Sequence, residues 1–119
     1  AHLNLAPLPH EGGFFRETWR SSLTVPSGTW PQLYAAPRAG GTAIYAVLTP
    51  GDFSALHRLA TDEVWHFYAG DALEMLNLHP DGSGWLLRLG PHFARGEHPQ
   101  RVVPAGVWHT LEVAEPGRL

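Results

Sequence analysis

The fold of this chain is decided by GDFSALHRLATDEVWHFYAG at residues 51–70 together with PAGVWH at residues 104–109. We expect the first stretch to form two strands joined by a short turn, and the second to form a tight turn that begins another strand. Side chains alternate between the two faces of a strand, so an inward His57 is accompanied by an inward Glu63. The second stretch places His109, Leu111 and Val113 on one side of the strand that it begins.

Composition predicts an ordinary globular protein with a single domain over residues 1–119. The chain is 44% hydrophobic and 16% charged, and it is long enough for one core but not for two. A net charge of -3 provides no attraction to nucleic acid or to an anionic membrane, so neither is expected as a partner. The absence of cysteine excludes thiol catalysis and thiolate zinc sites. No apolar run is long enough to span a bilayer, and a cytoplasmic location is expected by default.

Turns are frequent, because 13 glycines and 11 prolines are spread between short apolar runs. This distribution is typical of a sandwich or a barrel. Alternation and apolar content predict strands at residues 14–21, 42–48, 54–59, 63–68, 72–78, 85–89, 100–103 and 108–113. The strand at residues 42–48 is expected to be buried.

The sequence also predicts the connections between these strands. HPDGSG at residues 79–84 predicts a hairpin turn, because Asp-Gly tolerates the positive φ that such turns need. Residues 1–8 fit the end of a helix or a short helical turn that proline stops, and residues 24–41 fit a long connection with an extended piece at residues 30–34. The pattern predicts an all-β jelly-roll barrel whose mouth can hold one small ligand.

Both stretches resemble the motifs of the cupin superfamily. The first cupin motif is G-x5-H-x-H-x3,4-E-x6-G, and its matching residues here are Gly51, His57, Glu63 and Gly70. Leu59 stands where the second histidine belongs. The second motif, P-x-G-x-x-H, is met by residues 104–109.

The chain resembles the cupin-5 family more specifically, over roughly residues 7 to 113. The motifs that carry this resemblance are HEGGFFRET (residues 10–18), HR (57–58), DEVWH (62–66), GEHPQ (96–100) and VPAGVW (103–108). The resemblance implies the jelly-roll fold of RmlC-type sugar epimerases, in which the two motifs bring His57, Glu63 and His109 to one point inside the barrel. It also implies a homodimer, and the aromatic residues Trp19 and Trp30 are candidate contacts because of their apolar surface. Family members usually continue beyond both ends of these residues, and they often carry glutamine where this chain has His109.

Three interpretations of His57, Glu63 and His109 are open. Imidazole and carboxylate are ligands of iron, manganese, zinc or nickel, and three protein ligands leave a position open for substrate or water. Without a metal, a histidine beside a carboxylate can act as a general base or acid. The third interpretation is a hydrogen-bonded polar cluster that does no chemistry. Alternation directs His66 to the outer face, away from the cluster.

Further residues are candidates for a ligand pocket, because aromatic faces stack on sugars and bases. They are Tyr45, Trp65, Phe67 and Trp108, with Gln100, Arg16 and Glu17 as polar members. The alternative for the aromatic residues is ordinary barrel core, and for Arg16 with Glu17 it is a cross-strand ion pair. We expect a cupin enzyme with isomerase-like, epimerase-like or metal-assisted chemistry on a small polar, sugar-like or nucleotide-like substrate. The alternative is a binding module without catalysis.

Overall fold

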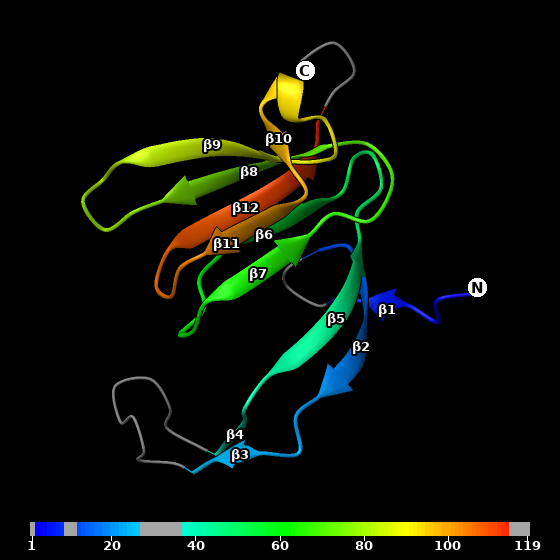
Figure 1. The fold of residues 1–119 in the computed structure, drawn as a ribbon, viewed down its shortest axis with the longest axis vertical. Coiled ribbons are helices and arrows are strands. Elements are labelled where there is room, and N and C mark those ends of the chain that lie inside the picture. Colours follow the sequence, from blue (N-terminus) through cyan, green and yellow to red (C-terminus); the bar gives the residue numbers. More distant parts are fainter. Residues whose placement is uncertain (1, 9–11, 27–36, 115–119) are drawn as a thin grey trace.

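The computed structural model describes residues 2–8, 12–26 and 37–114, and most of its regular structure is β-strand (Figure 1). The strands are β1 (Ala6–Pro7), β2 (Phe14–Arg20), β3 (Thr24–Val25), β4 (Arg38–Ala39), β5 (Thr42–Val47), β6 (Phe53–His57), β7 (Glu63–His66), β8 (Leu73–Leu78), β9 (Gly84–Leu89), β10 (Glu97–His98), β11 (Gln100–Val103) and β12 (Trp108–Val113). The described residues also contain one turn of 3-10 helix, η1 (Phe93–Arg95). None of their helical structure is long and apolar enough to cross a bilayer. The predicted all-β class is confirmed.

The strands form one large sheet and several smaller ones. The large sheet has the order β10-β9-β8-β12-β6, and β7 pairs with β11. The β7–β11 pair faces the large sheet, because Glu63 in β7 contacts His109 in β12. β1, β2 and β5 form a third sheet, from which the β3–β4 ribbon extends away from the large sheet (Figure 1). Two facing sheets are what the predicted jelly roll requires.

The core lies between the large sheet and the β7–β11 pair. Its fully or nearly fully buried side chains are Met75, Val103, Val107 and Leu111, against which Leu48, Trp65, Leu73 and Leu87 pack. Met75 of β8 lies directly opposite Leu111 of β12, so both point to the same inner face. His109 lies two residues before Leu111 on β12 and therefore points into the same interior.

The loop between β9 and β11 is organised around Glu97, which is completely buried. Its Oε1 atom accepts a hydrogen bond from the backbone N–H of His92, with a nitrogen–oxygen distance of 3.1 Å. A side chain at Gly90 would bring its Cβ within 2.5 Å of the same oxygen. Gly90 and Glu97 thus fit together, and this explains the glutamate of the GEHPQ segment as a structural residue.

Most of the predicted strands are present, with small differences at their ends. The hairpin turn at residues 79–84 is also present: His79 donates its N–H to the carbonyl of Ser83 at 2.9 Å, and Gly82 has a φ of 88°. Residues 30–34 lie outside the described residues. The strand predicted at residues 54–59 ends at His57, just before the connection to β7.

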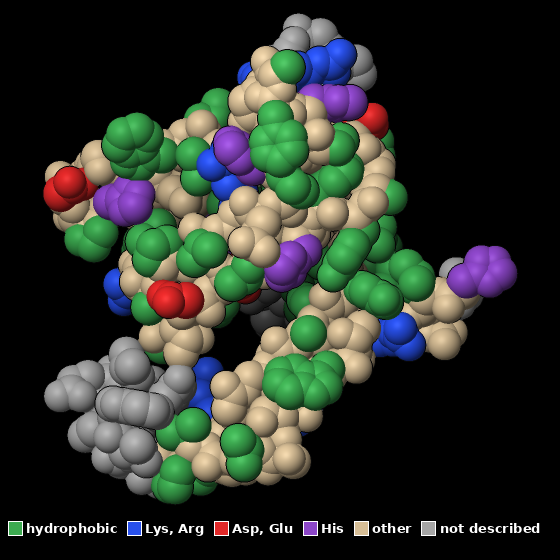
Figure 2. Space-filling view, in the orientation of Figure 1, with side chains coloured by type: hydrophobic (Ala, Val, Ile, Leu, Met, Phe, Trp, Pro, Cys, Tyr) green, Lys and Arg blue, Asp and Glu red, His purple; other side chains and the backbone are tan. Residues whose placement is uncertain are grey.

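Two expectations are wrong. Residues 2–8 do not form a helix: Ala6–Pro7 is strand β1, which pairs with β2 and so uses the proline at a sheet edge. The strand at residues 42–48 was expected to be buried, but Ala43, Ile44 and Tyr45 are exposed in β5. An apolar run identifies a strand without specifying what covers it, and Figure 2 shows hydrophobic side chains at the surface of this region.

Candidate functional site

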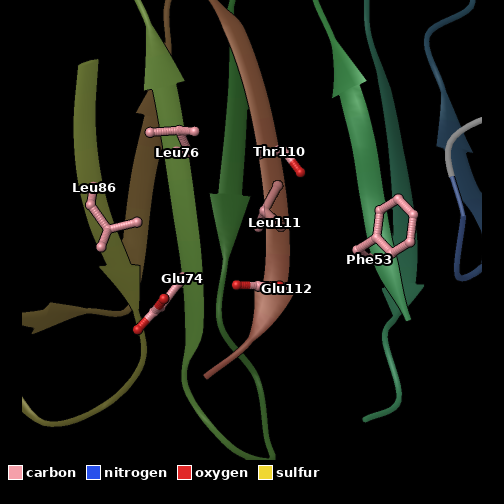
Figure 3. A pocket seen from close by; sticks show the side chains of 7 residues that line it. All are labelled: Phe53, Glu74, Leu76, Leu86, Thr110, Leu111 and Glu112. Atoms are coloured by element: carbon pink, nitrogen blue, oxygen red, sulfur yellow. The ribbon is translucent and has the colours of Figure 1, made fainter. Parts of the chain in front are cut away.

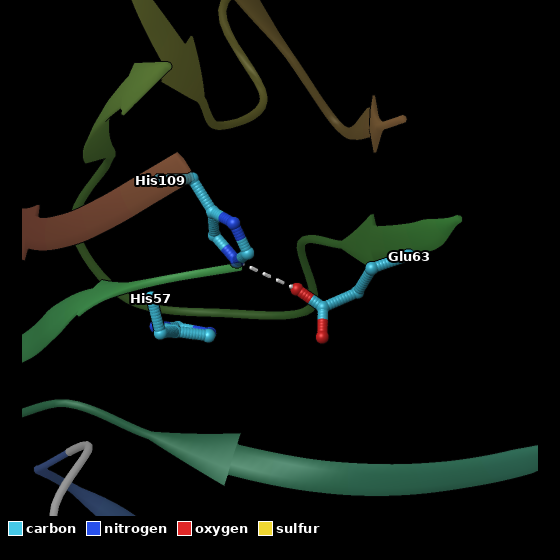
Figure 4. Close-up of side chains that lie close together, drawn as sticks. All are labelled: His57, Glu63 and His109. Atoms are coloured by element: carbon cyan, nitrogen blue, oxygen red, sulfur yellow. Dashed lines mark hydrogen bonds and ion pairs between the residues drawn. The ribbon is translucent and has the colours of Figure 1, made fainter. Parts of the chain in front are cut away.

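Three side chains that are distant in the sequence meet inside the fold (Figure 4). His57 ends β6, Glu63 begins β7, and His109 lies near the start of β12. One potential ligand atom of each lies within 4.8 Å of the other two. His109 is completely buried, whereas His57 and Glu63 are half-buried. The cluster is therefore closed on the side of His109 and accessible from solvent on the side of the other two.

Two hydrogen bonds hold the halves of this site together. The backbone N–H of Gly106 donates to the carbonyl of Leu59 at 2.8 Å, and that of Ala105 donates to the Asp62 carboxylate, also at 2.8 Å. Gly106 has a φ of 78°, a left-handed conformation that favours glycine. The turn before β12 is thus fastened to the turn between β6 and β7, and this connection sets the distance from His109 to Glu63.

The proton on His57 is positioned by the backbone. Its Nδ1 atom lies 2.6 Å from the carbonyl oxygen of Ala55. A carbonyl oxygen can only accept, so Nδ1 carries a proton and donates it. In the neutral ring Nε2 then holds a lone pair. A backbone carbonyl that orients a histidine in this way is common behind metal ligands and general bases alike.

His109 forms an ion-pair contact with Glu63. Its Nε2 atom lies 3.0 Å from Glu63 Oε1, and its Nδ1 atom lies 3.4 Å from the carbonyl oxygen of Val107. Both ring nitrogens therefore face oxygen atoms, and the nitrogen that carries the proton donates it to its neighbouring oxygen. The ring of His57 lies close by, with 4.2 Å between the two ring centroids.

Glu63 is held in its ionised form by its neighbours. Burial is the largest single influence and raises the pKa of Glu63, but the hydrogen bond and the charge of His109, the hydrogen bond of Trp65 and the charge of His57 together outweigh it. The pKa of Glu63 is therefore lowered. The Trp65 indole N–H donates to Glu63 Oε1 at 2.6 Å and so fixes the carboxylate in place.

The three residues fit a divalent metal. Two imidazole nitrogens and one carboxylate oxygen are a common donor set for iron, manganese, zinc or nickel. Two ligand atoms on one ion lie at most about 4.4 Å apart when each bond is about 2.2 Å. The outer limit of 4.8 Å in the cluster thus needs only a small side-chain adjustment. Leu59 stands where a fourth ligand occurs in the general motif. Its backbone carbonyl accepts the hydrogen bond from Gly106 in the turn before β12.

Two of the predicted pocket residues belong to this neighbourhood. Trp65 is half-buried, bonds Glu63 and packs against the core cluster. Phe67 is half-buried just beyond β7, where its N–H donates to the carbonyl of Pro99 at 2.7 Å. The exposed His66 lies between them on the outer face, as alternation predicts.

The other predicted pocket residues make different contacts. Trp108 lies on the opposite face of β12 from His109, with the Arg58 guanidinium 5.1 Å from its ring centroid. Gln100 is exposed and lies opposite the outward His66. Tyr45 contacts Tyr68 edge to face.

The two charged residues of β2 do not form a pair with each other. The Arg16 guanidinium lies 5.6 Å from the ring centroid of Tyr45. Glu17 instead pairs with Arg20 of the same strand at 2.6 Å. Neither contact involves His57, Glu63 or His109.

A separate hollow of about 260 Å³ lies on the outer face of the large sheet (Figure 3). It is lined by Phe53, Glu74, Leu76, Leu86, Thr110, Leu111 and Glu112. It contains the carboxylates of Glu74 and Glu112 but no histidine. The two histidines and the carboxylate that could hold a metal ion lie on the inner face instead.

Two residues that position or line the site were missed in the sequence. Asp62 fastens the turn before β12, and its signal is its place in the DEVWH segment. Asn77 is buried on the inner face of β8, directly opposite His109. Its signal is a polar residue at an inward position of an otherwise apolar strand.

The fold and the site define a small cupin domain. The family model Cupin_5, described as cupin superfamily (DUF985), matches residues 1–118. The chain belongs to this family. The family assignment made from the five sequence motifs is confirmed.

Relatives share the fold over most of this chain. A hypothetical protein from Leishmania major has a TM-score of 0.84 at 32% identity, over 98% of this chain and 69% of its own. A protein from Shewanella oneidensis has a TM-score of 0.81 at 33% identity, over 95% and 65%. An uncharacterized protein of Saccharomyces cerevisiae is 29% identical over 103 residues, 82% of this chain. The chain spans about half, 51%, of the length of that yeast relative.

Proposed function

We propose that this cupin domain binds a small polar molecule at His57, Glu63 and His109 and isomerises it by moving a proton. The observation that carries the proposal is the 2.6 Å contact between His57 Nδ1 and the carbonyl oxygen of Ala55. This contact leaves the lone pair of Nε2 available in a half-buried position. A base of this kind suits removal of a proton from a carbon beside a carbonyl group.

The reaction can be written with these residues alone. His57 Nε2 takes the proton, the C–H bond breaks, and its electron pair moves toward the carbonyl oxygen to give an enolate. The ionised Glu63, whose charge interacts with His57, stabilises the imidazolium that forms. His57 then returns the proton to the neighbouring carbon, which was the carbonyl carbon, while the proton of the adjacent hydroxyl group passes to the enolate oxygen, so that the carbonyl and hydroxyl groups exchange places. His109 keeps Glu63 ionised and oriented through the 3.0 Å contact.

Metal-assisted chemistry is a second candidate, and the donor set of the cluster favours it. His57, Glu63 and His109 would hold the ion. A bound divalent metal would act as a Lewis acid that polarises a carbonyl oxygen of the substrate. In that case the Ala55 carbonyl and the Trp65 indole would orient two of the ligands.

Proton exchange in deuterium oxide tests the first candidate. A panel of aldoses, ketoses and their nucleotide-linked forms is incubated with the protein, and deuterium at carbon is followed by NMR. We expect incorporation that survives chelation and is lost in His57→Gln. The control is His66→Gln, because His66 is exposed on the outer face of the adjacent strand.

The remaining outcomes separate the alternatives. Two results together would replace the first candidate with the second. Proton exchange would disappear on chelation, and the protein would contain stoichiometric metal that both His57→Gln and His109→Gln lose. Tight binding of a panel member without any exchange or turnover would contradict both and indicate a binding module without catalysis.

We also propose that the chain forms a homodimer. The resemblance implies one, and Trp19, which is 56% exposed, offers apolar surface for the contact. Trp30, the other candidate, lies outside the described residues. Light scattering after size exclusion is expected to give twice the chain mass, and Trp19→Glu is expected to shift it toward the monomer. A monomer at high concentration would contradict the proposal.

A further inference from the structure

Four side chains lie in one row across the inner face of the large sheet. His57 of β6 is paired with His109 of β12, His109 with Asn77 of β8, and Asn77 with Trp85 of β9. Residues directly opposite each other in antiparallel strands point to the same face. The row therefore begins at the proposed base and continues over Asn77 to Trp85.

Asn77 provides an unused acceptor in this row. It is only 3% exposed, and its Oδ1 atom is buried without a hydrogen-bond partner. A buried carbonyl oxygen that has lost water and gained no donor is unfavourable for the folded protein. A hydroxyl or N–H group of a ligand would satisfy it, beside the histidine that it faces.

Trp85 provides an exposed ring at the far end of the row. It is 58% exposed, although its alternation places it on the inner face with Asn77. The next inward residue, Leu87, packs against the core, so the row leaves the core and reaches solvent at Trp85. An exposed indole on the face of a site is a platform on which a planar ring can stack.

The spacing of the row indicates the size of the ligand. Neighbouring strands lie about 4.8 Å apart, so three steps from His57 to Trp85 span about 14 Å. We propose that the site extends along this row and takes a nucleoside-like molecule. Its hydroxyl-bearing part binds between the histidines and Asn77, and its planar ring stacks on Trp85. The inference deepens the proposed function, since it names the substrate class of the same site.

Calorimetric titration of the whole chain with uridine and with ribose tests the proposal. Stacking on one aromatic side chain changes affinity by about tenfold or more, so uridine is expected to bind at least tenfold more tightly than ribose. Trp85→Ala should reduce uridine to the affinity of ribose. Asn77→Leu, which keeps the volume and removes the acceptor, should weaken both about tenfold.

The matched control is Trp108→Ala. Trp108 is also a partly exposed tryptophan of the large sheet, but it lies on the opposite face. We expect it to leave the preference for uridine unchanged. Equal affinity for uridine and ribose, equal effects of the two tryptophan variants, or no binding of either probe would overturn the subsite. Thermal unfolding of each variant verifies that it is folded.

The subsite and the proposed reaction fail in different ways. Uridine binding that depends on Trp85, without proton exchange on any compound, retains the subsite and rejects the isomerase. If Trp85→Ala still exchanges protons on ring-bearing compounds with an unchanged KM, the proposed isomerase activity is retained and the proposed subsite at Trp85 is rejected.

Discussion

The large sheet and the β1-β2-β5 sheet both contain apolar side chains, but they bury them to different extents. The large sheet buries Met75 and Leu111 completely, whereas β5 leaves Ile44 44% exposed and β2 leaves Trp19 exposed. The β7–β11 pair packs across the inner face of the large sheet, while the chain after β5 reaches the core through Leu48. The burial of a strand depends on what packs across its sheet, and the sequence of that strand alone does not specify this.

The largest contrast is expected from truncating one apolar side chain in each sheet. Leu111→Ala removes a completely buried side chain and should lower the free energy of unfolding by about 2–5 kcal/mol. Ile44→Ala in β5 should cost less than about 1 kcal/mol, because the side chain is already partly in water. Urea unfolding measures both. Equal losses would show that β5 is buried in solution, as in a dimer that covers it.

A smaller contrast is expected when a methyl group is added to a glycine in each region. Gly90→Ala would place its Cβ 2.5 Å from Glu97 Oε1 and 3.0 Å from Ala72 Cβ, at a cost of about 1–3 kcal/mol. Gly40→Ala, beside the small β3–β4 ribbon, meets its nearest atoms at 3.4 Å and should be nearly neutral. Thermal unfolding compares the two, and a neutral Gly90→Ala would contradict the close fit around Glu97.

A third test concerns the connection between the two motif halves. Asp62→Ala removes the acceptor of the Ala105 N–H, which should lower stability by about 0.5–1.5 kcal/mol. The same variant should decrease proton exchange more than stability suggests, because the turn positions His109. Asp52→Ala is the control: its carboxylate also bonds a turn, at Thr49, but it does so away from the cluster. Unchanged exchange in Asp62→Ala would argue against this positioning role.

The smallest effect is confined to acid conditions. The lowered pKa of Glu63 means that its ionisation stabilises the fold above the ordinary value of about 4.3. This contribution is lost as the pH falls through the lower pKa of the folded state. Stability should therefore fall on acidification, and less so in Glu63→Gln. Glu17→Gln is the control, since the exposed pair of Glu17 with Arg20 contributes about 0–1 kcal/mol. An identical acid response in all three proteins would contradict the assignment.

Much of the site was predictable because it is encoded in short motifs. Period two directed His57 and Glu63 to one face and His66 to the other, and the proline and glycine before β12 predicted the turn that begins it. Trp108 is different. Its aromatic ring makes it a candidate for a pocket wall, but its neighbour His109 points inward, so alternation along β12 turns the Trp108 ring outward.

The sequence alone determined the all-β class, most of the strands, the family and the identity of the three clustered residues. These follow from local alternation and from residue types at set spacings. Only the tertiary structure decided that β5 is exposed and that Asn77 faces His109. The first depends on what packs across the sheet, and the second depends on the register between two strands. The residues in such contacts are far apart in the chain, and nothing in the local sequence shows which of them will pair.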